Sequence, residues 1–511
     1  MNGKRKKPSA NGSKIFFLNT TTMKNNTTST ATKQGEIGHL SIDADAIRKE
    51  AKNFFTSNGK IEHAKVLQEV LDNLQEVDFR SIANVDDEQK VSQKVQRVLT
   101  VDEVLRVARD LNCGLCRNQD FVYAYNGEFW QLIDRNELES FLGEASNKLG
   151  VDDITARDYE FKAKLFKQFM ADAYLPKPEN QKDVVLINLR NGTFEITENE
   201  QKRRDFCPSD FLTYQLPFEY QAAADCPKWQ NFLDEVLPDK SRQNVLAEYM
   251  GYVFARNLKL EKTLILYGTG ANGKSVVSDV TNTLLGKENV SNFSLESLGE
   301  NYFRAMIANK LLNYSSEISN RLQVEKFKQL TSGEPVEARL PYGQPMTLTN
   351  YARLAFNCNE LPKDVEHTEA FFRRFLILPF DIMIPENRRN PNLAKEIIGA
   401  ELSGVFNWIL DGLKRLLQQN GFSPCDAAQK MVDTFRRESD SVAMLLDDEG
   451  YKASNDNQIL LKDLYQDYKT FCQNDGYKPL GKRNFKKRLE GQNISVGTGT
   501  GNKVFVGIER T

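Results

Sequence analysis

LILYGTGANGKS, residues 264–275, joins an apolar run to a glycine-rich turn and to the first residues of a helical pattern. It contains the spacing G-x-x-x-x-G-K-S, in which glycines let the backbone curl so that its N–H groups point at the phosphates of a nucleotide. Apolar residues then recur at helical spacing, so the loop is expected at a helix N-terminus, where an anion is favoured. The stretch therefore predicts a strand, a phosphate-binding loop and a helix in succession.

Each position of this loop has an expected role. Lys274 would reach the β- and γ-phosphates, and the Ser275 hydroxyl would hold Mg²⁺. The other loop residues would line the phosphates: Gly268, Thr269, Gly270, Ala271, Asn272 and Gly273. Kinases, GTPases, transporters and motors all use such a loop, so the motif alone does not say what hydrolysis drives.

Two later segments add polar groups that a nucleotide site needs. A short strand expected within 308–317 ends in Glu317, a carboxylate able to orient water or to reach Mg²⁺. A second strand, expected within 353–362, is followed by Asn359, which would sense the γ-phosphate. Both residues are therefore candidate catalytic groups.

A pair of arginines precedes another apolar strand. Arg373 and Arg374 stand directly before residues 375–380, which read FLILPF. An arginine so placed can act across a subunit boundary, as a finger that neutralises charge in the transition state. Either arginine fits this role.

The order of these motifs resembles that of the superfamily 3 helicases, in particular the phage and plasmid primase-helicase C-terminal family, which includes the poxvirus primase-helicase. The resemblance rests on the loop, on the strand ending in Ser-Glu and on the segments KQLTSGE, FNCNELP and FFRRF, and it covers about residues 118–511. It implies a P-loop core similar to that of AAA+ ATPases, ATP as the nucleotide, and a homo-hexameric ring that moves along single-stranded DNA.

The same resemblance assigns DNA contacts. Its third motif, which includes Lys328, leads into a hairpin expected at 338–348 that would project into the ring channel. Lys328, Arg339 and Tyr342 are the expected contacts; Tyr342 would either stack on a base or pack as a turn residue. Ser316 stands where many P-loop enzymes have an aspartate, which would leave Mg²⁺ mainly to Ser275, the phosphates and water, with Glu317 as base and indirect ligand.

The end of the chain combines helices with a terminal hairpin. A basic helix is expected at 482–489, and two short strands within 494–508 follow it. This succession looks like a winged helix, whose second helix often enters the major groove of duplex DNA. The expected phosphate contacts are Lys482, Arg483, Lys486, Lys487 and Arg488. A solvated basic face or a protein-binding wing is the alternative.

The fold class expected is α/β, with a superfamily 3 core of AAA+ type, an α+β domain before it and a winged helix after it. Six segments follow from the motifs: a basic, Ser/Thr/Asn-rich, disordered leader at 1–40, a helical region at 41–117, the α+β domain at 118–230, the ATPase domain at 231–390, a helical linker at 391–430 and the winged-helix-like domain at 431–511.

Composition limits the location and the partners. The formal net charge is −2, so nucleic-acid binding must be local, and no apolar run is long enough to span a membrane. Cys113 and Cys116 form a lone C-x-x-C without a second pair, and packing is the favoured role. We expect a cytoplasmic protein of a bacterial or phage-infected cell.

A primase activity is not expected in this chain. Asp43 and Asp45 resemble paired metal-binding acids, but they fit better as helix-capping residues, and no catalytic Ser-x-His follows them. A primase encoded separately is an expected partner. The function expected is that of an ATP-dependent helicase on single-stranded DNA, acting in replication of a phage, plasmid or other mobile element. The alternatives are an ATP-switched initiator that binds duplex DNA without processive unwinding, and a binding module with a decayed ATPase.

Overall fold

The computed structural model describes most of the 511-residue chain, namely residues 62–86, 89–118, 121–175, 184–316, 318, 323–340, 345–362, 365–499 and 503–510. These residues belong to one compact unit, Lys60–Thr511. Several expected features lie outside the described residues: the leader 1–40, Asp43, Asp45, Glu317 and Tyr342. Among the described helices, none combines the length and the apolar character needed to cross a bilayer.

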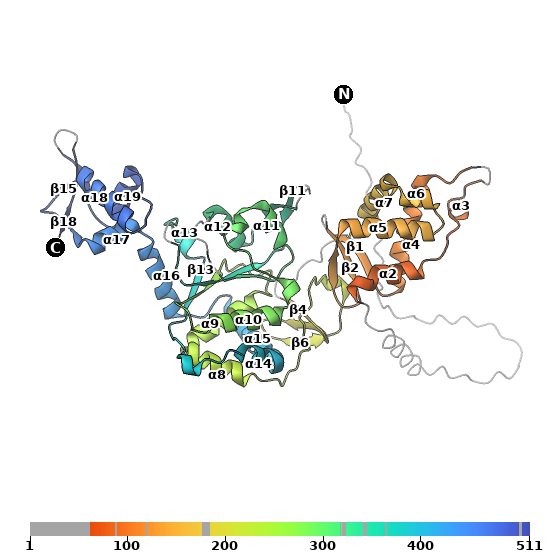
Figure 1. The fold of residues 1–511 in the computed structure, drawn as a ribbon, viewed down its shortest axis with the longest axis horizontal. Coiled ribbons are helices and arrows are strands. Elements are labelled where there is room, and N and C mark those ends of the chain that lie inside the picture. Colours follow the sequence, from red (N-terminus) through yellow and green to blue (C-terminus); the bar gives the residue numbers. More distant parts are fainter. Residues whose placement is uncertain are drawn as a thin grey trace, which may run out of the picture. The chain divides into compact units, whose positions relative to one another are not determined.

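A five-stranded parallel sheet forms the centre of the segment expected to be the ATPase domain (Figure 1). Its order is β13 (Phe375–Pro379), β7 (Thr263–Tyr267), β12 (Arg353–Cys358), β9 (Leu312–Ser315) and β8 (Val290–Ser291). The strands are almost entirely buried, as expected when helices cover both faces of a parallel sheet. The α/β class expected from the sequence is confirmed.

Alternating side chains of β7 enter two different cores. Leu264 and Leu266 pack with helices on one face, α8 (Pro227–Val236), α9 (Lys240–Tyr252), α10 (Lys274–Leu285), α14 (Leu393–Ala400) and α15 (Leu402–Gln419). Ile265 packs on the other face with α11 (Asn301–Met306), α12 (Val324–Ser332), α13 (Glu369–Phe372) and α16 (Asp426–Glu438). Successive side chains of a strand point to opposite faces, which explains the division.

The segment 391–430 is part of the first of these cores. Val405, Phe406, Ile409 and Leu413 of α15 are buried together with residues of α9 and α10. Gly251 of α9 and Gly412 of α15 let these two helices approach closely, because a Cβ on Gly412 would lie 2.4 Å from the Ala247 carbonyl carbon. The segment expected to be a linker therefore belongs to the layer of helices that covers one face of the parallel sheet.

The first described residues form a helical group with a small sheet. Its helices are α2 (His63–Asn73), α3 (Phe79–Ile82), α4 (Gln93–Asp110), α5 (Arg135–Lys148), α6 (Asp153–Arg157) and α7 (Tyr159–Asp172), and its antiparallel strands are β1 (Gly114–Asn118), β2 (Phe121–Tyr125) and β3 (Trp130–Ile133). The boundary expected at 117/118 falls inside β1, because Leu115 shares a core with Val104 of α4. Cys113 and Cys116 are both buried free thiols, and burial raises the pKa of Cys113 to about 11.

A second antiparallel sheet precedes the ATPase segment. It contains β4 (Val185–Leu189), β5 (Gly192–Ile196) and β6 (Gln201–Arg204), and β4 and β5 form a hairpin whose turn precedes Gly192. Gly192 has φ 138°, a conformation that favours glycine. Ile187 and Phe194 of this sheet belong to the same core as α8 and α9. Short 3₁₀ turns in the described chain include η1 (Pro208–Asp210), η2 (Lys287–Asn289), η3 (Ser297–Gly299) and η4 (Glu386–Arg388).

The C-terminal residues have their own core. The helices are α17 (Ser441–Asp448), α18 (Leu461–Asn474) and α19 (Lys482–Gly491), and the strands are β14 (Tyr451–Ala453), β15 (Ile459–Leu460), β16 (Val496–Thr498), β17 (Val504–Val506) and β18 (Ile508–Arg510). Phe485 and Leu489 of α19 are buried against Leu464 and Tyr468 of α18. The sheet order is β15-β17-β16, with β14 paired to β18. The basic helix α19 and the strand pair β16–β17 occur where the sequence predicts them.

Candidate nucleotide site and DNA-contacting elements

The loop between β7 and α10 has the conformation that its glycines permit. Gly270 and Gly273 have φ values of 114° and 90°, and Ala271 also lies in the left-handed region at 49°. A Cβ on Gly273 would lie 2.8 Å from the Phe232 ring, so this position has no room for a side chain. Thr269, Ala271 and Ser275 are exposed to solvent. The loop can therefore receive phosphates from the solvent side.

Asn272 anchors the loop from inside. Its amide nitrogen donates to the Phe380 carbonyl at 3.0 Å, just past the end of β13. A Cβ on Gly268 would lie 2.2 Å from this amide nitrogen and 2.6 Å from the Phe380 oxygen, so glycine is required there. The Ile384 N–H donates to the Ala271 oxygen at 2.8 Å. The segment after β13 thus holds the loop, a support that the P-loop motif does not predict.

Lys274 is buried within this loop, with 6% of its surface exposed. Its ammonium donates to the Gly268 carbonyl at 2.6 Å and to the Asn272 amide oxygen at 3.1 Å. Burial lowers the pKa of Lys274 from its ordinary value. An ammonium held by neutral oxygens, with no carboxylate of the described residues bound to it, suits an incoming phosphate. The residues of the loop therefore fit a nucleoside triphosphate with Mg²⁺.

The sheet order brings two further predicted positions to the same edge. β12 lies between β7 and β9, and the Gly268 N–H donates to the Cys358 carbonyl at 3.0 Å. Asn359 follows Cys358 directly and is exposed beside the loop. β9 ends at Ser315, opposite Phe356 of β12. The described chain thus brings Asn359 and the residues leading to Glu317 to the loop's end of the sheet.

A buried link between β9 and β12 was not found by sequence reasoning. The Tyr314 hydroxyl donates to the Asn357 amide oxygen at 3.0 Å. Burial raises the pKa of Tyr314, so its hydroxyl stays protonated. Polar residues in two otherwise apolar strands were the available signal. The link fixes the strand that carries Asn359 against the strand that leads to Glu317.

Arg373 and Arg374 lie at the other end of the sheet. They precede Phe375, which pairs with Thr263 at the start of β7, whereas Lys274 follows the end of that strand. A five-residue strand is about 15 Å long, so the structure does not bring the arginines to the loop of the same chain.

The two arginines have different surroundings. The Arg374 side chain is 9% exposed, and its guanidinium contacts the Ala370 carbonyl, the Ser332 hydroxyl at 2.9 Å and Glu261 at 3.2 Å. The Arg373 side chain is 56% exposed and pairs with Glu261 at 2.8 Å. Arg373 is therefore the arginine that another molecule can reach.

The expected hairpin is present. β10 (Val336–Arg339) pairs antiparallel with β11 (Pro345–Leu348), and Arg339 is exposed at the end of β10. The buried Arg304 of α11 fixes the hairpin, because its guanidinium donates to the Glu337 carbonyl at 2.8 Å. The Lys328 ammonium donates to both Glu366 carboxylate oxygens, at 2.8 and 2.7 Å, so it already has a partner within the chain.

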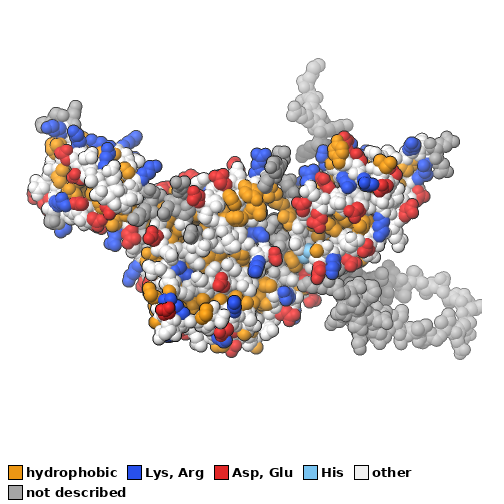
Figure 2. All heavy atoms as spheres, viewed as in Figure 1, with side chains coloured by type: hydrophobic (Ala, Val, Ile, Leu, Met, Phe, Trp, Pro, Cys, Tyr) orange, Lys and Arg blue, Asp and Glu red, His pale blue; other side chains and the backbone are white. Residues whose placement is uncertain are grey.

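The five cations of α19 do not share one environment. Lys482, Arg483 and Lys487 are exposed and have no ion-pair partner within the described part of the chain. Lys486 lies 3.6 Å from Glu490, and Arg488 lies 3.2 Å from Asp440. On the face seen in Figure 2, basic and acidic side chains are interspersed, in agreement with a formal net charge of −2. Basic surface is thus local, as the sequence indicates.

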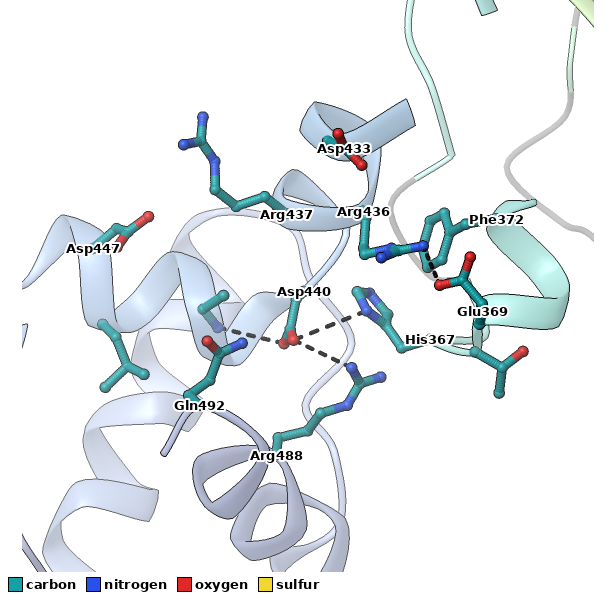
Figure 3. Close-up of a pocket in the computed structure, with 13 residues that line it drawn as sticks. His367, Glu369, Phe372, Asp433, Arg436, Arg437, Asp440, Asp447, Arg488 and Gln492 are labelled. Carbon is teal, nitrogen blue, oxygen red and sulfur yellow. Dashed lines mark hydrogen bonds and ion pairs between the residues drawn. The ribbon is translucent and has the colours of Figure 1, made fainter. Parts of the chain in front are cut away.

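Arg488 lines a cavity of about 490 Å³ next to α16 (Figure 3). Asp440 accepts from the Val442 N–H, pairs with Arg488 and lies 3.9 Å from His367. The Ser439 hydroxyl lies 3.2 Å from the second His367 ring nitrogen. Burial lowers the pKa of His367, so the ring is neutral at pH 7. Arg488 therefore joins α19 to Asp440, between α16 and α17, a role that the sequence did not indicate.

Comparison with known proteins gives three matching family models. A family described as "D5 N terminal like" matches residues 106–238, and one described as "Poxvirus D5 protein-like" matches residues 437–505. A family of unknown function (DUF5906) matches residues 266–374, the stretch that contains the loop.

Two viral proteins match parts of this chain. The chain is 25% identical over 213 residues to "Putative helicase L207/L206" of Acanthamoeba polyphaga mimivirus, covering 38% of this chain and 22% of that protein. It is 21% identical over 328 residues to "Putative helicase 121R" of Invertebrate iridescent virus 3, covering 56% of this chain and 35% of that protein. The chain thus spans between about a fifth and a third of the length of these relatives.

Two solved structures of the C-terminal region of NrS-1 also match. Both are 13% identical to this chain, with TM-scores of 0.45 and 0.46, and they cover 79% and 80% of it and 98% of the NrS-1 chains. The two D5-type models lie on either side of the loop-bearing segment, and the viral relatives carry helicase names. The family models and the viral relatives thus show that parts of this chain are similar to D5-like primase-helicases.

Proposed function

We propose that this chain is an ATP-driven helicase that moves along single-stranded DNA during replication of a virus, phage, plasmid or other mobile element. Similarity to D5-like proteins and to viral proteins named as putative helicases supports a helicase or primase role in DNA replication. The observation that supports the motor best is Lys274, buried at the end of a parallel strand in a loop whose shape suits phosphates. Helicases need such a site because unwinding consumes nucleotide.

The expected chemistry at this site is ATP hydrolysis assisted by Mg²⁺. Lys274 would exchange its two neutral acceptors for β- and γ-phosphate oxygens, and the exposed Ser275 hydroxyl would face the metal ion. Glu317 would accept the proton of the attacking water, and Asn359 would orient the γ-phosphate. Bound Mg²⁺ supplies charge neutralisation of the phosphates.

A ring of subunits would complete the site. Because Arg373 lies at the opposite end of β7 from Lys274, it can serve only the site of a neighbouring chain. We assign the finger to Arg373, which is exposed, and a bracing role to Arg374, which is buried and bound to Ser332. The family resemblance suggests six subunits in the ring.

DNA contacts would come mainly from the hairpin β10–β11. Arg339 is exposed at the described end of β10, and Tyr342, which lies outside the described residues, stands between the two strands in the sequence. Lys328 would act by holding the loop that contains Glu366, because its ammonium is already bound to both Glu366 carboxylate oxygens. Removing Lys328 should therefore affect the position of α12 more than the charge facing DNA.

An ATP-switched initiator is the second candidate. The exposed Lys482, Arg483 and Lys487 on α19 favour it, since a basic helix followed by a hairpin suits the winged helix that binds duplex DNA. An initiator would melt a few base pairs, whereas a motor unwinds processively. The two candidates therefore differ in the length of duplex that they open.

ATP hydrolysis at ring-forming concentration, with and without single-stranded DNA, tests the proposal. The native chain, Lys274→Ala and the control Lys395→Ala should be compared; Lys395 is an exposed lysine of α14. The motor predicts turnover that DNA stimulates several-fold and that only Lys274→Ala abolishes. An ATP hydrolysis rate that single-stranded DNA does not change would favour the initiator. If the native chain hydrolyses no ATP, a binding module would be the remaining function.

A further inference from the structure

A cavity of about 530 Å³ lies at the root of the hairpin β10–β11, where the chain enters and leaves it. Gly333 and Pro335 border it before β10, and residues 349–353 border it after β11. A third wall comes from the segment between α9 and β7, which supplies Arg256, Asn257 and Lys259. Three parts of the chain that are distant in sequence thus meet around one opening.

The lining of this cavity is positively charged without compensation. It contains Arg256, Lys259 and Arg353, and none of the described lining residues is Asp or Glu. Arg256 donates to the Tyr351 and Lys310 carbonyls, and no described carboxylate forms an ion pair with Arg256 or Arg353. Carbonyl oxygens satisfy N–H groups but do not cancel a full charge. The cavity therefore favours an anion.

The guanidinium of Arg353 has one buried nitrogen without a hydrogen-bond partner among the described residues. Its Nη2 atom donates to the Leu258 carbonyl at 2.8 Å and to the Ala255 carbonyl at 3.2 Å, while the buried Nε has no partner. Its Nη1 atom lies 3.9 Å from where a Cβ on Gly333 would stand, and both residues line the cavity. The guanidinium carbon lies 4.0 Å from the centre of the Tyr252 ring. The plane is thus fixed before any ligand arrives.

The charges in the cavity oppose one another. Burial and the nearby charge of Arg353 lower the pKa of Arg256 to about 10, so Arg256 is still protonated at pH 7. Two like charges held close together without a carboxylate cost free energy that a bound anion would recover. This supports a ligand site over a purely structural cluster.

The geometry points to a phosphate of the DNA strand as the ligand of this cavity. Guanidinium groups match phosphate oxygens in shape and charge, and phosphate contacts position nucleic acid without reading its sequence. The cavity adjoins the hairpin that the proposed function places on DNA, on which this inference rests. Phosphates of a nucleotide bound at the P-loop would be too far from this cavity to be its ligand. Arg353 begins the six-residue strand β12, and Cys358, which contacts the P-loop, ends it about 17 Å away.

Lys259 gives the cleanest test, because it is exposed and lines the cavity, whereas Arg353 also braces the backbone. Affinity for a single-stranded oligonucleotide should be measured by fluorescence anisotropy over a range of salt concentrations. Lys259→Ala should raise Kd about two- to fivefold, the range expected for one exposed charge contact. The slope of log K against log salt should fall by roughly 0.7, and Lys259→Glu should have a larger effect.

Lys395→Ala is the matched control and should change neither Kd nor the salt slope. Unfolding temperatures of all variants should equal that of the native chain, which shows that the fold is intact. If Lys259→Ala and Lys259→Glu behave like the control while the native chain binds DNA, the cavity inference is wrong and the motor stands. If the native chain binds no single-stranded DNA, both proposals fail.

Chemical protection identifies the source of the phosphate. Acetylation of Lys259, followed by mass spectrometry, should slow in the presence of the oligonucleotide and proceed unchanged with ATP or inorganic phosphate. Acetylation of Lys395 should be the same in every mixture. Equal protection by inorganic phosphate would overturn the assignment to a DNA strand and indicate a general anion site.

Discussion

Glu261 holds Arg373 through a carboxylate oxygen that lies 2.8 Å from the guanidinium. The same oxygen lies 3.2 Å from Arg374, so one carboxylate serves both arginines. Glu261 has φ 54°, and its neighbour Lys262 donates to the Arg373 carbonyl. The residues that lead into the P-loop strand thus hold the candidate finger at its starting position.

Glu261→Gln should destabilise the chain, because the buried Arg374 would lose its counter-charge. We expect a loss of about 1–3 kcal/mol in the free energy of unfolding, the range for a hydrogen bond to a charged group. Urea denaturation measures it, with Glu386→Gln as a control at the exposed Glu386. A native-like midpoint for Glu261→Gln would show that Ser332 and the Ala370 carbonyl suffice for Arg374.

Arg373→Ala and Arg374→Ala should separate activity from stability. Arg373→Ala should fold like the native chain and lose most ATP hydrolysis, because the exposed finger is gone. Arg374→Ala should lower the unfolding temperature, because Arg374 links Ser332 of α12 to the end of α13. Calorimetry and an ATPase assay on the same preparations measure both effects. Full hydrolysis by Arg373→Ala would reject the assignment.

Mixed rings should show that the finger acts on a neighbour. Lys274→Ala and Arg373→Ala chains are each expected to be inactive alone. In a mixture, an intact Lys274 can meet an intact Arg373 from the adjacent chain, so hydrolysis should reappear and peak near equal proportions. No recovery, with mixed assembly shown by native mass spectrometry, would mean that the two residues do not form one site.

Lys274→Ala should also remove stabilisation by nucleotide. A ligand at 100 times its Kd stabilises a folded protein by about 2.7 kcal/mol, which raises the unfolding temperature. We expect this rise with ATP and Mg²⁺ for the native chain and for Lys395→Ala, and none for Lys274→Ala. An equal rise in all three would place nucleotide binding away from the loop.

His367 should make stability depend on pH. Because its pKa in the folded chain lies below the ordinary value of 6.5, the unfolded chain takes up a proton first as pH falls. This contribution to stability is present above about pH 6.5 and is lost below it. His367→Asn should therefore lose less stability than the native chain between pH 7 and 5, as measured by denaturation at several pH values. Parallel curves would exclude the effect.

Local signals made the centre of the fold predictable. The apolar run of β7, the glycines after it and the helical spacing of α10 lie within about twenty residues, so no distant contact was needed to interpret them. The basic helix α19 likewise follows from a short pattern, whereas the hairpin β10–β11 was expected from the family resemblance. The α/β class and the glycine-rich loop between β7 and α10 could therefore be predicted from the sequence.

Long-range partners were not predictable. Lys328 meets Glu366, Arg488 meets Asp440, and Glu261 meets Arg373 across 112 residues, and each partner is one of many charged residues in the chain. The segment 391–430 looked like a linker because its apolar stripe does not say which core it enters. Only the packing of the sheet decides these contacts.

β12 has a consequence for how force would pass through a subunit. It is hydrogen-bonded to β7 on one side and β9 on the other, it ends beside the nucleotide loop, and it begins with Arg353 at the root of the hairpin. A strand clamped in this way cannot lengthen or slide alone. Any step along DNA would therefore require the sheet and hairpin to turn as one rigid lever against the neighbouring subunits.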